Sequence, residues 1–138
     1  MSAPIRLFHP GEALPEVVWP AISRTTLALY AGGSGDHNPL HLDPDFARAA
    51  GLPDVIGHGM LTMALLGRYL TSVTSQRALR TFQVRFLSMA QLGDTIVCQG
   101  KVVDVSDVAG ERHATLEVTA ATGAGVVLAA GSAVAVQS

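Results

Sequence analysis

The stretch Met60–Val73, MLTMALLGRYLTSV, restricts the fold of this 138-residue chain more than any other. Apolar residues fall on almost every side of the helix that it predicts, and such a helix is normally buried at the centre of a domain. The run is interrupted by Thr62, Gly67 and Arg68, and it is shorter than the roughly 20 apolar residues that cross a bilayer. Other elements of the chain must therefore surround this helix.

After this helix, the period of the apolar residues changes to that of strands. In TFQVRF, residues 81–86, apolar and polar side chains alternate, as in a strand with one buried face. Further strands are predicted at 95–105, 113–122 and 126–136, separated by turn sequences that each contain glycine. Strands in direct succession favour antiparallel pairing. We therefore expect an α+β fold in which a curved antiparallel sheet wraps one long central helix.

Shorter elements are predicted before the central helix. Glu16–Trp19 has the pattern of a short strand, and Ser23 is suited to cap a helix over residues 24–32 that a glycine pair ends. A second short helix is predicted after the cap Asp43, with proline at its first position. Because the chain shows no linker or internal repeat, residues 1–138 are expected to form a single domain.

The composition argues against several classes of function. Only 14% of residues are charged and the net charge is −2, so the clustered basic face of a nucleic-acid-binding protein is not expected. The N-terminal sequence lacks the charged start and long apolar run of a signal peptide. The single cysteine, Cys98, lies in a predicted strand and is expected to be a buried thiol. We therefore expect a cytoplasmic protein that binds neither nucleic acid nor membranes.

The sequence SGDHNPLHLD, residues 34–43, places a carboxylate, an amide and an imidazole within a few positions. Pro39 fixes its own φ and restricts Asn38 to extended conformations, so the loop is expected to be stiff. Asp36 and His41 would then be held where they can share one water, as an acid–base pair worth roughly 10²–10⁴ in rate per group. Alternatively, Asp36 and Asn38 only satisfy loop amides as turn residues, which leaves His41 without a structural task.

The glycines of GHGM, residues 57–60, lie directly before the central helix. N–H groups at a helix start lack internal partners, and the helix dipole favours negative charge there. Because Gly59 has no side chain, a substrate carbonyl can approach its N–H, and a reaction that passes through an enolate needs such a donor. The glycines are equally suited to a tight turn into the helix, and His58 is interpreted as structural.

Other motifs fit the loop less well. GGSGD resembles a nucleophile elbow, but Asp36 stands where G-x-S-x-G requires glycine, and the lysine of a P-loop is missing. His37, His41 and His58 lie close enough in sequence to be weighed as metal ligands. Pro39 separates the first two, however, and makes the helical spacing that would align them doubtful. We expect no metal at this loop.

Two segments of the chain carry a resemblance to a known family. YAGGSGDHNPLHLD contains the pattern D-x-N-P-[L/I]-H as Asp36–His41, and GLPDVIGHGMLT supplies H-G-M as His58–Met60. Over Tyr30–Leu70 the chain closely resembles the MaoC-like hydratases, also called R-specific enoyl hydratases or hydratase 2. These hot-dog-fold enzymes add water to trans-2-enoyl thioesters or remove it from (3R)-hydroxyacyl thioesters. Within the family, the chain looks most similar to small single-domain (3R)-hydroxyacyl-thioester dehydratase subunits.

The resemblance implies a role for each residue of the motif. Asp36 and His41 would be the catalytic pair that holds the water, and Asn38 would orient the loop and His41. The backbone N–H of Gly59 would donate to the thioester carbonyl. Some relatives carry a serine near the aspartate where this chain has Gly67 on the central helix, which leaves the support of Asp36 to other groups.

The resemblance also implies how the substrate and partners are met. Met60, Met63 and Leu66 share a helix face that would line an acyl tunnel, unless it packs in the core. No metal or redox cofactor is expected, because the CoA or phosphopantetheine carrier is part of the acyl thioester substrate. A single sheet leaves an edge strand exposed, so we expect a homodimer or a heterodimer with a related subunit.

Two alternatives stay open from the sequence. A hot-dog acyl thioesterase shares the fold and the substrate class, but it would hydrolyse the thioester and would not need the D-x-N-P-x-H loop. A non-catalytic acyl-binding subunit of a heterodimer would be expected to lack Asp36 or His41, whereas this chain has both.

Overall fold

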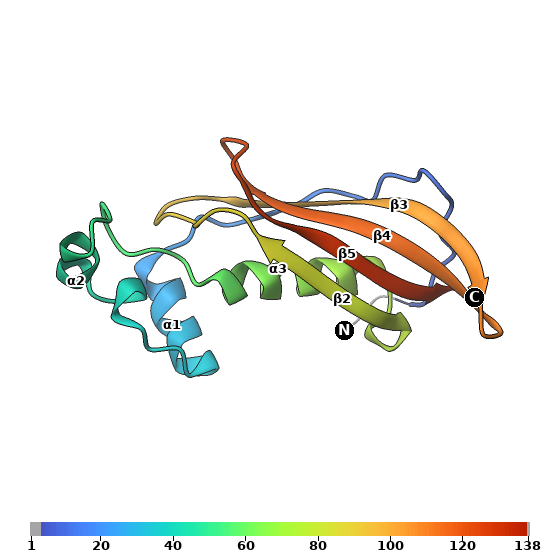
Figure 1. The fold of residues 1–138 in the computed structure, drawn as a ribbon, viewed down its shortest axis with the longest axis horizontal. Helices are drawn as coiled ribbons and strands as arrows, with labels where there is room; N and C mark the ends of the chain where they lie inside the picture. The colour runs from blue at the N-terminus through green and yellow to red at the C-terminus, as the bar shows by residue number, and fades with distance from the viewer. Residues whose placement is uncertain (1–3, 138) are drawn as a thin grey trace.

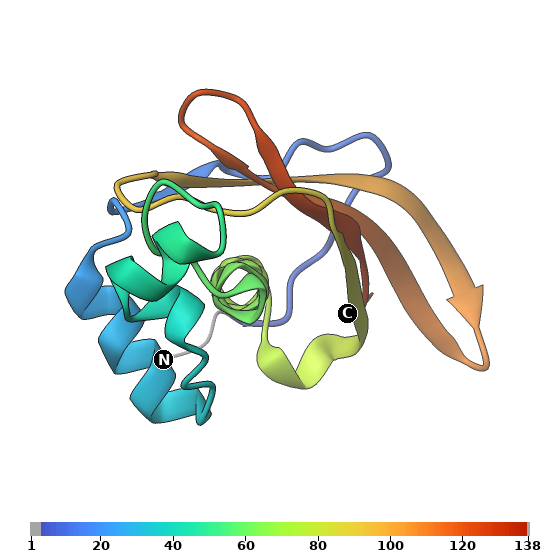
Figure 2. The same cartoon turned by 60° about the vertical axis from the view of Figure 1, so that its left-hand side comes forward.

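One antiparallel sheet curves over a single long helix in the computed structural model, which describes residues 4–137 (Figure 1). The strands are β1 (Val17–Trp19), β2 (Leu79–Phe86), β3 (Ile96–Val108), β4 (Glu111–Thr122) and β5 (Val127–Gln137). They lie in the order β1-β3-β4-β5-β2, and every neighbouring pair is antiparallel. Helix α3 (Gly59–Val73) runs beneath the sheet, as the end-on view of Figure 2 shows. The predicted α+β arrangement is confirmed.

The smaller helices gather at the end of the molecule where α3 begins (Figure 1). They are α1 (Arg24–Ser34), α2 (Pro44–Ala49) and, between them, the 3₁₀ helix Pro39–His41. A second 3₁₀ helix, Gln76–Ala78, connects α3 to β2. Ser23 caps α1 as predicted, but the glycine pair does not end this helix. It ends at Gly35, which takes the left-handed conformation at φ 79° and donates its N–H to the Ala31 carbonyl oxygen.

The strands extend further than the sequence indicated. Residues 106–108 were expected to belong to a turn, yet they continue β3. The chain reverses instead at Ala109 and Gly110, whose φ angles of 51° and 82° are both left-handed. A tight hairpin needs only two such residues, so the neighbouring residues remain free to pair.

Helix α3 is buried on the side that faces the sheet. Leu66, Tyr69 and Leu70 are fully buried and belong to the core formed with the inner face of the strands. A stripe on the other side stays open, where Met60 is 54% exposed and Arg68 is also exposed. The sequence pattern did not reveal this open stripe, because periodicity does not show how much of a helix one sheet can cover.

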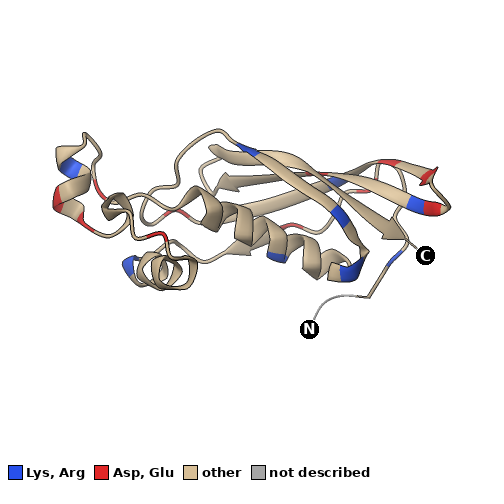
Figure 3. Cartoon of the chain, turned by 60° about the horizontal axis from the view of Figure 1, so that its bottom comes forward, with Lys and Arg blue, Asp and Glu red and all other residues tan. Residues whose placement is uncertain are grey.

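The structure also bears on the expectations drawn from composition. Among residues 4–137, no helix has the length and apolar character needed to cross a membrane. Lysine and arginine are scattered along the ribbon and do not gather on one face (Figure 3). Cys98 is a buried free thiol in β3, as predicted, and burial raises its pKa.

β5 passes very close to β2 at Gly131. A Cβ at this position would collide with the carbonyl oxygen of Gln83 and would lie 2.7 Å from the Cα of Val84. Both obstacles are backbone atoms of the paired strand, so neither can move aside as a flexible side chain would. The close approach of these two strands therefore requires glycine at residue 131.

We expect Gly131→Ala to lower the free energy of unfolding by about 2–3 kcal/mol, because the added methyl group must push β2 away from β5. Urea denaturation monitored by circular dichroism measures the change. Gly33→Ala is the matched control, since a Cβ there meets nothing within 4 Å and helix α1 gains by up to about 1 kcal/mol from alanine. Equal stabilities for the two variants would contradict this account of the sheet.

Candidate active site

The loop after α1 holds Asp36 and His41 face to face. The Nε2 atom of His41 lies 3.8 Å from the Oδ2 atom of Asp36, which is too far for a direct hydrogen bond. A water placed beside both atoms would reach each of them at about 2.8 Å. The His41 side chain is 11% exposed and that of Asp36 is 52% exposed. The stiff loop therefore produces the arrangement that an acid–base pair around one water needs.

The main-chain carbonyl of Ile56 fixes the orientation of the His41 ring. The Nδ1 atom of His41 lies 2.7 Å from this oxygen. A carbonyl oxygen can only accept a hydrogen bond, so Nδ1 carries the proton and the neutral ring has its lone pair on Nε2. That lone pair faces Asp36. His41 thus has a structural contact that sequence reasoning did not find, and the same contact prepares Nε2 to accept a proton.

Asn38 shapes the loop through its backbone and its side chain, and its main-chain oxygen accepts the N–H of His41 at 3.0 Å. Its Oδ1 accepts the N–H of Leu40 at 3.0 Å and so caps the 3₁₀ helix that carries His41. Asp36 in turn accepts the N–H of Asn38 through Oδ1 at 3.2 Å. The turn contacts considered as an alternative to catalysis therefore coexist with the facing pair. Since Gly67 has no side chain, the support of the carboxylate comes from its own loop.

A cleft of about 400 Å³ opens beside the pair. Its walls include His41, Gly59 at the start of α3, and residues 86–90 after β2. The Gly59 N–H has no acceptor among residues 4–137. A Cβ on this glycine would make only ordinary contact, 3.5 Å from the ring of Phe86, and its φ is not left-handed. Neither packing nor backbone conformation demands glycine here, so the missing side chain leaves the N–H accessible to a ligand.

The methionines proposed for an acyl tunnel lie outside the walls of this cleft. Met60 is exposed on the open stripe of α3, Met63 is half-buried, and Leu66 packs in the core. The apolar side chains that do line the cleft come largely from residues 86–90. A tunnel along Met60 and Met63 stays a prediction.

His58 packs against both members of the facing pair. Its ring stacks on that of His41 with centroids 3.7 Å apart and planes 23° apart. Its Nε2 atom lies 3.2 Å from the main-chain oxygen of Asp36, and the edge of Tyr30 packs against it with centroids 4.7 Å apart. The sequence pattern H-G-M drew attention to this position, but we interpreted the residue only as structural. Its direct contact with His41 became visible only in the folded chain.

The surroundings of His58 keep it neutral. Burial lowers its pKa below the ordinary 6.5, and the proximity of His41 acts in the same direction. The hydrogen bond to the Asp36 carbonyl and the Asp36 charge oppose this shift without reversing it. Burial also raises the pKa of Tyr30, with a further contribution from the Asp36 charge. His58 and Tyr30 are therefore both favoured in their neutral forms.

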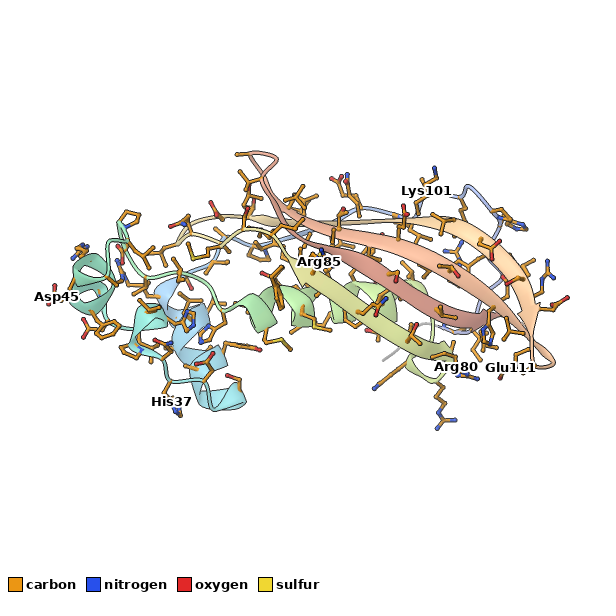
Figure 4. The ribbon with its side chains drawn as sticks, viewed as in Figure 1. His37, Asp45, Arg80, Arg85, Lys101 and Glu111 are labelled. Carbon is orange, nitrogen blue, oxygen red and sulfur yellow. The ribbon has the colours of Figure 1, made fainter. Side chains whose placement is uncertain are left out.

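Asp36, His41 and His58 together offer ligand-type atoms within 4.8 Å of one another, so metal binding has to be tested against geometry. A metal binds an imidazole near the plane of the ring, at roughly 2.1 Å from the nitrogen. Two stacked planes only 23° apart meet far beyond that distance from either ring. A metal held by both histidines does not fit. His37, also considered as a ligand, points away from the rest of the chain in Figure 4.

Known proteins share this fold and sequence pattern. Residues 8–124 match the family model described as "MaoC like domain". The chain is 28% identical over 116 residues to 3-hydroxyacyl-thioester dehydratase Z of Mycobacterium tuberculosis, over 79% of this chain and 77% of that protein. R-hydratase PhaJ1 from Pseudomonas aeruginosa, in the unliganded form, has 25% identity and a TM-score of 0.81, with 94% of this chain and 83% of that chain covered.

A third similar structure is the ChsH1-ChsH2 complex from Mycobacterium tuberculosis. It has a TM-score of 0.81 at 22% identity, with 95% of this chain and all of that chain covered, and the likeness is one of fold. The match to the family model extends well beyond the motif segment into the strands. The chain belongs to the MaoC-like domain family. It is a hot-dog-fold lyase of the hydratase and dehydratase class.

We expect the free energy of unfolding to fall as the pH is lowered from about 7.5 to about 5.5, in part because of His58. Since its folded pKa is depressed, the unfolded chain binds the proton first, so the His58 contribution is complete above 6.5 and is lost as the pH falls toward the folded pKa. His58→Phe removes the titrating group and should flatten the slope in urea denaturation. If the free energy of unfolding of His58→Phe changed with pH as steeply as that of the wild type, groups other than His58 would cause the pH dependence.

Proposed function

We propose that this chain interconverts trans-2-enoyl thioesters and (3R)-hydroxyacyl thioesters of fatty acyl chains, carried by CoA or by acyl carrier protein. The observation that carries the proposal is the distance of 3.8 Å between His41 Nε2 and the Asp36 carboxylate, where His41 borders the cleft that Gly59 also lines. Adding water across a conjugated double bond needs a group that deprotonates the water and a donor for the carbonyl oxygen. The names of the dehydratase and the R-hydratase that this chain resembles describe the same chemistry.

In the proposed hydration, one water lies between Asp36 Oδ2 and His41 Nε2. The Nε2 lone pair takes a proton as the water oxygen forms its bond to C3 of the substrate. The electrons of the C2–C3 double bond move toward the thioester carbonyl, whose oxygen gains negative charge. The Gly59 N–H, at the positive end of the α3 dipole, donates a hydrogen bond to that oxygen.

The second proton completes the reaction on the same face. The Asp36–His41 pair returns one proton to C2, so the addition is syn and the carbonyl regains its double bond. Dehydration follows the same steps in reverse: a proton leaves C2, and the hydroxyl group leaves C3 as water. The proposed reaction uses no metal or redox cofactor, because proton transfer and one backbone donor complete it. CoA or phosphopantetheine enters as part of the substrate.

The walls of the cleft also suggest how the acyl group binds. Residues 86–90 supply apolar side chains opposite the start of α3, where an acyl chain attached to the reacting carbons can lie. Met60 and Met63 follow Gly59 along α3 and would contact a chain that extends past this region. Thr62 is the α3 side chain that borders the cleft in the single chain.

We expect Asp36→Asn and His41→Ala each to lower the turnover number by about 10² or more while the fold is retained. The assay follows the loss of enoyl absorbance of trans-2-enoyl-CoA and, in parallel, the release of free thiol. His37→Ala is the matched control, a loop histidine that points away from the site and should leave turnover unchanged. Release of thiol would identify a thioesterase instead, and a near-normal rate in either variant would remove that residue from the mechanism.

We also propose that the chain pairs with a second hot-dog chain along β2. This strand is an edge of the sheet, and the other edge is the three-residue β1. Phe86 at its end is 47% exposed, and Leu87 and Met89 beyond it are 55% and 54% exposed. The three residues form an apolar strip beside an unpaired edge, which favours association. The proposed partner is a second copy of this chain or a related subunit. The ChsH1-ChsH2 complex, which shares this fold, is an example of two different chains in one complex.

Sedimentation velocity of the purified chain is expected to give about twice the monomer mass of 14.3 kDa at micromolar concentration. Leu87→Asp places a charge on the apolar strip and should shift the protein toward monomer. Leu29→Asp is the control, since Leu29 is 72% exposed on α1, away from β2. A wild-type monomer would exclude the homodimer and leave only a related subunit as partner.

A further inference from the structure

We propose that His58 is a positioning residue that locks Asp36 and His41 into one arrangement. The inference rests on the proposed catalytic roles of these two residues. His58 itself is 2% exposed and does not border the cleft, so it is not placed to touch the substrate. Any effect that it has on the reaction must pass through the residues that it contacts.

The first contact holds the backbone from which the carboxylate projects. The Nε2–H group of His58 donates to the main-chain oxygen of Asp36 at 3.2 Å. The other hydrogen bonds of Asp36 join it to residues two positions away: its N–H donates to the Ser34 hydroxyl at the end of α1, and its Oδ1 accepts the N–H of Asn38. Within the described part of the chain, His58 is therefore the one hydrogen-bond partner of Asp36 that lies far from it in the sequence.

The second contact holds the ring that carries the lone pair. The Ile56 carbonyl fixes one edge of His41 through Nδ1, but a single hydrogen bond leaves the ring free to tilt about that contact. The face of His58, stacked at 3.7 Å, opposes this tilt. Tyr30 packs edge-on against His58 and holds it in turn. Nε2 of His41 is thereby kept directed at Asp36.

The third point is charge. His41 becomes a cation when it takes a proton from water, and the face of a neutral aromatic ring tolerates a cation. The groups that face His58 are Tyr30 from α1 and Asp36 and His41 from the loop. Because burial lowers the pKa of His58 and favours its neutral form, a proton that His41 takes up places one charge in the stack and not two.

A purely structural role explains the imidazole poorly. His58 occupies the N-cap position of α3, but its side chain makes no capping hydrogen bond. Its Nδ1 atom is buried and has no partner among residues 4–137. Burying an unpaired polar atom costs about 1–3 kcal/mol, which an apolar side chain at this position would not cost. Packing alone therefore does not explain a histidine at this position. Its contacts with Asp36 and His41 do, if they hold these two residues in place.

Three variants separate the two contacts. His58→Phe retains a ring that can stack but loses the donor, His58→Gln retains a donor but loses the stack, and His58→Ala loses both. We expect His58→Ala to lower kcat about tenfold or more with KM changed less than about twofold, and the other two variants to fall between it and wild type. Tyr69→Phe is the matched control, because it alters a fully buried core residue and should leave kcat and KM unchanged.

A double-variant comparison tests whether His58 acts through the pair. In an Asp36→Asn background the pair is already disabled, so adding His58→Phe should lower kcat by less than about twofold. Effects that multiply, or His58 variants with normal kcat, would overturn the positioning role. If Asp36→Asn itself retained normal turnover, the proposed role of Asp36 would fail instead, whereas a wild-type protein that does not hydrate enoyl-CoA would contradict the proposed function. Thermal unfolding of each variant shows whether the kcat was measured on folded protein. If His58→Phe does not fold, His58→Gln replaces it in the double variant.

The protonation of the ring gives a readout independent of activity. Nitrogen NMR of the wild-type protein at about pH 7 should find His58 with a proton on Nε2 and none on Nδ1, because the Asp36 carbonyl accepts from Nε2. In His41 the pattern should be reversed, with the proton on Nδ1. A His58 ring protonated on Nδ1 would contradict the proposed bond to Asp36 and with it the positioning role.

Discussion

The hydrogen bond from His41 Nδ1 to the Ile56 carbonyl oxygen is the contact on which the proposed chemistry of the site depends. It selects the tautomer of the histidine and aims its lone pair at Asp36. Ile56 is itself held from two sides, since its N–H donates to Leu40 at 3.1 Å and the next N–H, of Gly57, donates to the Ala90 carbonyl at 2.8 Å. The same short segment leads directly into α3. One stretch of backbone therefore places the His41 ring, the accessible N–H of Gly59 and a wall of the cleft.

The fold could be predicted from the sequence because it rests on local patterns. Alternating apolar residues gave the strands, and the apolar helix required a sheet to cover it. The residues at which the helices and strands end were harder to predict. Helix α1 passes through Gly32 and Gly33 and stops at Gly35, because a glycine ends a helix only when it takes the left-handed conformation, and the path of the following loop decides which one does. Similarly, periodicity places Met60 and Met63 on a common face of α3 but does not show what covers that face.

The candidate site was predictable to the extent that one stiff loop forms it. Pro39 and the caps around it bring Asp36 and His41 together, so their proximity follows from the sequence alone. The contacts of His58 and of the Ile56 carbonyl did not follow, because they depend on how that loop docks against the segment before α3. No spacing or composition encodes such a docking. His58 was read as structural for this reason, although its ring lies directly on His41.

The division of the site between residues 34–41 and residues 55–59 has a consequence for protein engineering. Grafting the first segment onto another scaffold would transfer an acid and an imidazole without the oxygen that selects the tautomer, and without the amide that we propose meets the substrate. The smallest portable unit therefore includes both segments. The intervening α2 region belongs to the same unit, because it packs against the 3₁₀ helix that carries His41 and buries Ala47 in the core.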